Sequence, residues 1–218
     1  MKTLSTLVLC FFISGQLLVA QQDSALMQEA GDNYSKSNFP KAIANCDKVL
    51  RINDQNVSAH NLKGLSYLAL AQAEFQKRNS DEGTRLVGLA NSSFSAAIKI
   101  IPTEKFFWYN RGYGNLWINK ADLAIPDFDR AISLDSTFQI AWRERGRAYL
   151  AKENFAKGTA DLSKAVDLNP KDQWANYFLG EAYGNKYLDK KALPYLDKAA
   201  ESCPDCFDAY MTRAIVYT

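Results

Sequence analysis

A few residue types in this 218-residue chain could carry chemistry, and the cysteines are the first of them. Cys203-Pro-Asp-Cys206 has the spacing of a dithiol that cycles between thiol and disulfide. A redox site of this kind needs strand–helix context, whereas this motif stands in a turn between helical stretches. Cys203 and Cys206 are therefore a possible structural disulfide, with free thiols as the alternative, and redox catalysis is disfavoured.

The single histidine, His60, leaves little scope for nucleophilic catalysis or for a metal centre. It stands where later segments carry Trp108 and Trp142, which is a packing position, and the chain has no second closely spaced cysteine pair. Gly112-Tyr-Gly114 resembles the start of a phosphate loop but lacks its third glycine. We expect no enzyme activity, no cofactor and no metal.

Two arginine–aspartate pairs recur along the chain at a spacing of sixteen residues: Arg111 with Asp127, and Arg145 with Asp161 (127−111 and 161−145). Buried carboxylates can be catalytic. However, 34 residues further on, both members become apolar together, as Leu179 and Tyr195. A joint change of this kind predicts structural ion pairs that bridge two helices.

The spacing of these pairs belongs to a longer pattern. Gly112, Gly146 and Gly180 are 34 residues apart (146−112 and 180−146), and several other columns recur at the same interval. Among them are small residues at Ala124, Gly158 and Ala192 and at Ala131, Ala165 and Ala199, and bulky ones at Phe128, Leu162 and Leu196. A constant period of this length predicts a solenoid of repeated units.

Within a unit, apolar residues fall at helical spacing in two runs, and Asn169-Pro170 ends one of them because proline cannot continue a helix. Small residues at the glycine and alanine columns let two helices approach closely. The segments Trp142-Arg-Glu-Arg-Gly146-Arg-Ala-Tyr149 and Ala165-Val-Asp-Leu-Asn-Pro170 resemble the tetratricopeptide repeat. The resemblance implies an all-α, right-handed superhelical solenoid of antiparallel helix pairs.

The column matches divide residues 21–218 into repeats. The units run from about 23–56, 57–104, 105–138, 139–172 and 173–206, followed by a half unit at 207–218. Gly64 lies 48 residues before Gly112, so the second unit carries 14 extra residues (48−34). Seven extra residues on each helix would add about two turns, which predicts a projecting helical hairpin with Ser80 or Asp81 as the cap. A flexible loop is the alternative.

The first twenty residues have the pattern of a secretory signal peptide: Lys2, an apolar stretch, and a small residue, Ala20, before the expected cleavage site. We therefore expect an exported protein, periplasmic or extracellular, that has no membrane span. The remaining 198 residues (218−20) are expected to form one elongated domain in which Cys46 is a buried apolar residue. The formal net charge of +2 gives no basic surface for nucleic acid.

The family resemblance also implies where a partner would bind, because the first helix of each unit lines a concave groove. Helical spacing selects candidate groove residues: Asn61, Leu65, Phe106, Tyr109, Tyr113, Trp117, Arg143, Arg147, Trp174, Tyr177 and Glu181. Aromatic side chains and arginines favour binding of a protein or peptide segment. Family members that grip a C-terminal carboxylate use positions that hold Met27, Gly31, Leu62, Ile140 and Glu144 here, so that activity is not expected.

The segment 207–218 offers a second way to bind a partner. It is apolar nearly all round, whereas terminal repeats normally present a polar outer face. The alternative function is therefore a structural or assembly subunit, or a homodimer, that uses this segment and the projecting hairpin.

Overall fold

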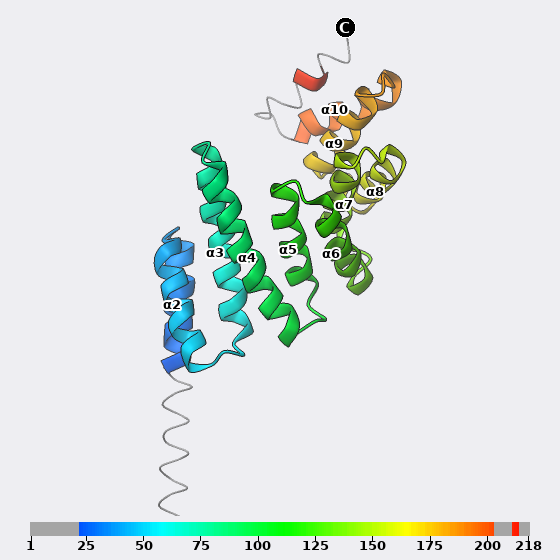
Figure 1. The fold of residues 1–218 in the computed structure, drawn as a ribbon. Coiled ribbons are helices and arrows are strands. Elements are labelled where there is room, and N and C mark those ends of the chain that lie inside the picture. The colour runs from blue at the N-terminus through cyan, green and yellow to red at the C-terminus, as the bar shows by residue number, and fades with distance from the viewer. Residues whose placement is uncertain (1–21, 203–210, 214–218) are drawn as a thin grey trace, which may run out of the picture. The chain divides into compact units, whose positions relative to one another are not determined.

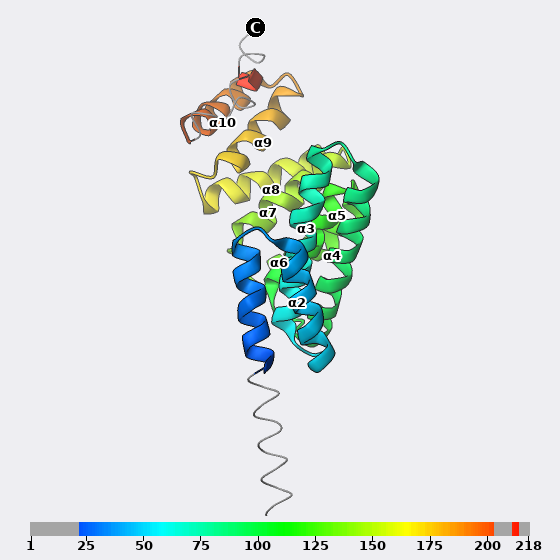
Figure 2. The same ribbon diagram turned by 90° about the vertical axis from the view of Figure 1, so that its left-hand side faces the viewer.

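The computed structural model describes residues 22–202 and 211–213, and all regular structure in these ranges is α-helical. Its helices are 22–35, α2 (Phe39–Ile52), α3 (Val57–Gln76), α4 (Ser80–Ile100), α5 (Lys105–Trp117), α6 (Ala121–Leu134), α7 (Gln139–Ala151), α8 (Phe155–Leu168), α9 (Gln173–Gly184) and α10 (Asp189–Ser202). Consecutive helices form antiparallel pairs (Figure 1, Figure 2), one pair in each expected unit. The expected signal peptide, the Cys203–Cys206 motif and most of 207–218 lie outside the described residues.

The chain divides into two compact units, Met1–Pro102 and Thr103–Thr218, where we expected one elongated domain. Each repeat of a solenoid contacts only its neighbours, so a division between two repeats breaks few contacts. The first unit contains the helix 22–35 and α2 to α4. The second contains α5 to α10.

The glycine column marks where the two helices of a pair touch. A Cβ added at Gly146 would lie 2.8 Å from Leu162 Cγ and 3.0 Å from the backbone oxygen of Gly158, and one added at Gly180 would lie 2.7 Å from Leu196 Cγ. Leu162 and Leu196 are both fully buried. The recurring glycines therefore allow α7 and α9 to lie directly against α8 and α10.

Every helix pair turns through the same geometry. Ser37, Arg78, Asn119, Glu153 and Tyr187 have left-handed φ angles of 56° to 61°. The backbone N–H after each of them donates to a carbonyl five residues earlier, at 2.8 to 3.0 Å, which is the bond that closes a Schellman motif. Such a bond satisfies a carbonyl that the end of the first helix would otherwise leave without a partner.

The spacing of these turns shows how the extra 14 residues are accommodated. Left-handed residues are 41 apart on either side of the second pair (78−37 and 119−78) and 34 apart afterwards (153−119 and 187−153). Seven residues have thus been added to each helix, so the flexible-loop alternative is wrong. At the tip, Gly83 lies against the Phe75 ring, and Val87 is fully buried.

The expected cap of this hairpin is wrong. Asn79 is the N-cap of α4, and Ser80 is the first residue of the helix. The Asn79 side chain forms no capping bond, because its amide donates to the carboxylate of Glu74 at 2.9 Å.

Candidate functional site

In the second unit, α5 contacts α7, and α7 contacts α9. These are the first helices of three successive pairs, and the surface that they share is called the first-helix face below. It carries all the expected groove residues except two. Asn61 and Leu65 are half-buried on α3 of the first unit.

Three aromatic side chains form a ladder along α5. The rings of Tyr109 and Tyr113 stack with centroids 5.8 Å apart, and Trp117 follows Tyr113 at 5.1 Å. Tyr109 also packs edge-on against Phe138, and its burial, followed by the nearby charge of Glu144, raises the pKa of its hydroxyl. Tyr109 is therefore partly a core residue, whereas Tyr113 and Trp117 are half-buried and keep part of their surface exposed.

The two arginines of α7 differ from the sequence interpretation. Glu144, only 1% exposed, accepts a hydrogen bond from Arg143 Nε at 2.8 Å and another from Arg147 Nη1 at 2.5 Å. Arg143 also donates to Asp172 at 2.8 Å. Two acids neutralise two bases, so these arginines carry no excess charge for a partner carboxylate. Arg143, with a side chain 14% exposed, is mainly structural, and Arg147 at 34% keeps a contact surface.

A second group of aromatic side chains lies on α9. The rings of Trp174 and Phe178 stack at 5.9 Å, and the Arg147 guanidinium lies 4.4 Å from the centre of the Phe178 ring. The Tyr177 hydroxyl donates to Glu181 at 3.0 Å. Trp174 is 42% exposed, a large open area for an aromatic residue on a packed helix. Phe106, at the start of α5, is 47% exposed, and its ring packs edge-on against Phe138.

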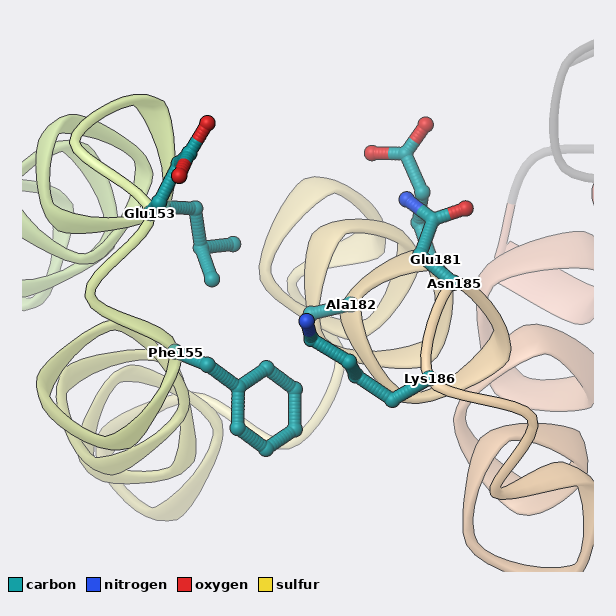
Figure 3. Close-up of a pocket in the computed structure, with 7 residues that line it drawn as sticks. Glu153, Phe155, Glu181, Ala182, Asn185 and Lys186 are labelled. Carbon is teal, nitrogen blue, oxygen red and sulfur yellow. The ribbon is translucent and has the colours of Figure 1, made fainter.

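A pocket of about 520 Å³ adjoins this face, between the C-terminal ends of α7 and α9 (Figure 3). Leu150, Glu153 and Phe155 form one wall, and Glu181, Ala182, Asn185 and Lys186 form the other. Only Glu181 belongs to the residues that the sequence singled out. The pocket forms because Glu153 and Phe155 lie in the turn after α7, close in space to a helix that begins eighteen residues later (173−155).

Both expected ion pairs are present and are structural. Arg111 donates to both oxygens of Asp127, at 3.0 and 2.6 Å, and Arg145 does the same to Asp161, at 2.7 and 2.8 Å. The guanidinium groups lie over the rings of Trp108 and Trp142, which explains the recurring tryptophan. In the next repeat, Leu179 and Tyr195 pack into one apolar cluster.

The described part of the chain shows no constellation suited to catalysis. Within it, no group of three or more His, Cys, Asp or Glu side chains could hold a metal ion. His60 Nε2 lies 2.9 Å from the backbone oxygen of Asp54, and Cys46 is fully buried. Among the helices of residues 22–202, none is long and apolar enough to cross a membrane.

Sequence reasoning missed Glu144 and Phe178 as parts of this face. A signal for Glu144 was visible, because an acid that stands one residue after Arg143 and three before Arg147 can reach both on a helix. Phe178 gave no comparable signal, since it falls outside the columns expected to face the groove. Its role depends on the Arg147 side chain of the preceding pair.

Comparison with known proteins agrees with this architecture. No protein-family model matches the chain, and no curated protein matches it. Among solved structures, that of the protein MamA matches with a TM-score of 0.70 and 23% identity over 84% of this chain and 92% of that one. YrrB, described as a TPR protein with an unusual peptide-binding site, matches with a TM-score of 0.66 and 21% identity over 87% and 90%.

A third match is a thermophilic TPR protein from Thermus thermophilus, with a TM-score of 0.65 and 16% identity over 89% of this chain and 98% of that one. At these identities the similarity establishes the fold. The chain has the helical-solenoid fold of tetratricopeptide-repeat proteins, an architecture that serves protein interaction in general.

Proposed function

We propose that this chain is a non-enzymatic scaffold, exported from the cytoplasm, that binds a segment of another protein on its first-helix face. The observation that carries the proposal is the aromatic surface of α5 and α9, in which exposed Trp174 and half-buried Tyr113 and Trp117 adjoin a pocket of about 520 Å³. Aromatic rings supply large contact areas at low entropic cost and dominate the binding energy of many interfaces.

The charges of the face favour a particular kind of contact. Because Glu144 and Asp172 already neutralise Arg143 and Arg147, a terminal carboxylate gains little there. A segment that places apolar side chains between the α5 ladder and Phe178, and backbone groups against the tyrosine hydroxyls, uses what the face offers. An extended or helical peptide meets this description.

Export rests on the pattern of residues 1–20. The expected mature protein begins at Gln21, and N-terminal sequencing of protein recovered from the periplasm or the medium tests this. Recovery of an intact Met1 terminus from the cytoplasm alone would contradict export and would leave the binding proposal unaffected.

Binding is tested by affinity capture from the native exported fraction. The full chain is compared with a Tyr113→Ala, Trp174→Ala variant and with a control, Leu123→Ala, which removes a 56% exposed side chain from α6, a second helix. All three should give the same circular dichroism spectrum. We expect a partner that the parent and the control retain and that the double variant loses.

Equal capture by all three proteins would contradict binding at the first-helix face. The alternative, an assembly subunit or homodimer through 207–218, then becomes the better explanation. Of that segment only 211–213 are described, with Met211 46% exposed and Arg213 paired with Asp197 at 3.0 Å. Light scattering of the full chain would show a second copy directly.

A further inference from the structure

The pocket between the ends of α7 and α9 has a chemical character of its own. We propose that it takes a long cationic side chain, arginine or lysine, of the bound segment. The inference rests on the proposed function and specifies which residue the partner must present.

The two walls place carboxylates at one end of the pocket and apolar surface at the other. Figure 3 shows Glu153 and Glu181 on opposite walls with their carboxylates toward the same end, and the Phe155 ring away from them. Leu150, Phe155 and Ala182 supply the apolar lining. Arginine and lysine combine an apolar stem with a charged head, and this arrangement suits both parts.

Both carboxylates are available for a new ion pair. Neither Glu153 nor Glu181 forms a salt bridge with any residue that the structure describes, in contrast to Glu144 with its two arginines. The base of the pocket, Lys186, has its ammonium 6.0 Å from the centre of the Phe155 ring. Two acids against one base leave the pocket with a net charge of −1, which attracts a cation and repels an acidic side chain.

The carboxylates are also held in position before a partner arrives. Glu153 is the left-handed residue of its turn, with φ of 58°, and its N–H donates to Leu150 O at 2.8 Å while the next N–H donates to Tyr149 O at 2.9 Å. Glu181 is oriented by the Tyr177 hydroxyl at 3.0 Å. Pre-positioned groups lose less freedom on binding, so more of the attraction appears as affinity.

The test is selection of a random twelve-residue peptide library, displayed on phage, against the full chain. We expect selected peptides to share an arginine or lysine at one position, and its replacement by norleucine to weaken binding about fivefold. A Glu153→Gln, Glu181→Gln variant should bind the parent peptide about fivefold more weakly and should no longer distinguish it from the norleucine peptide. Reversal of both charges, Glu153→Lys and Glu181→Lys, should shift the selection toward aspartate or glutamate.

A control with the same change of net charge, Asp167→Asn and Glu201→Gln, alters two exposed acids that do not line the pocket and should retain the preference. Peptides that need Tyr113 but show no basic preference would overturn this inference and leave the proposed function standing. The same holds if the preference persists in the Glu153→Gln, Glu181→Gln variant. A library that yields no binding peptide would overturn both.

Discussion

Arg145 of α7 donates to both oxygens of Asp161 in α8, at 2.7 and 2.8 Å, and thereby joins the two helices of one repeat. Its remaining terminal nitrogen, Nη1, donates to Asp129 of α6, in the preceding repeat, at 2.7 Å. The Trp142 ring lies 4.7 Å from the guanidinium carbon. One side chain thus links helices within a repeat and between adjacent repeats.

The two acids around Arg145 should differ in their effect on stability. Asp161→Asn removes a carboxylate whose side chain is 9% exposed, and we expect a loss of about 2 kcal/mol because a half-compensated charge stays buried. Asp129→Asn alters a side chain that is 50% exposed and should cost less than about 1 kcal/mol. All four tryptophans lie in Thr103–Thr218, so tryptophan fluorescence during urea unfolding follows this unit selectively. Equal losses would show that Arg145 depends on neither acid in particular.

Glu144 should be the more demanding glutamate of α7 and its turn. Glu144→Gln leaves Arg143 and Arg147 without their shared buried counter-charge, and we expect a loss of about 3 kcal/mol in the free energy of unfolding. The matched change Glu153→Gln alters an exposed acid and should stay within about 0.5 kcal/mol. Urea unfolding followed by tryptophan fluorescence compares the two. A small effect of Glu144→Gln would mean that Asp172 alone compensates both arginines.

The hairpin of the first unit contains two glycines that should respond in opposite directions to alanine. A Cβ at Gly64 would lie 2.6 Å from the ring of Phe94, which is fully buried and cannot move aside, so Gly64→Ala should destabilise by about 1–3 kcal/mol. Nothing lies within 4 Å of a Cβ at Gly88, so Gly88→Ala should stabilise α4 by about 0.5–1 kcal/mol. Thermal unfolding by far-ultraviolet circular dichroism gives both signs. Destabilisation by both would point to a general intolerance of the hairpin.

Cys46 should make the first unit sensitive to alkaline pH. Burial, with a smaller contribution from the charge of Asp47, raises the pKa of the Cys46 thiol from 9.0 to about 11. Because the folded-state pKa is the higher one, this stabilisation is fully present below pH 9 and is lost as pH rises from 9 through 11. Other groups also titrate in this range, so the measurement is the difference between parent and Cys46→Ala in free energy of unfolding against pH. Parallel curves would contradict the prediction.

Much of the fold could be predicted from the sequence because its determinants recur at short range. The 34-residue period of Gly112, Gly146 and Gly180 predicted the helix pairs, and the glycines lie where one helix meets the other. The sixteen-residue spacing of Arg111 and Asp127 predicted their ion pair, since both belong to one repeat. The capping residue of α4 was missed because Asn79 uses its amide on Glu74 instead of on the helix end.

The character of the binding face was decided by tertiary structure. Arg143 and Arg147 looked free in sequence, yet Arg143 pairs with Asp172, 29 residues away in the turn before α9, and both share buried Glu144. The pocket likewise joins Glu153 and Phe155 to Glu181 and Lys186 of the next repeat. The sequence by itself determined the repeat, its helix pairs and the contacts within each pair, because helical spacing is local. Only the packing of one repeat on the next determined which charges are neutralised and where a partner side chain can enter.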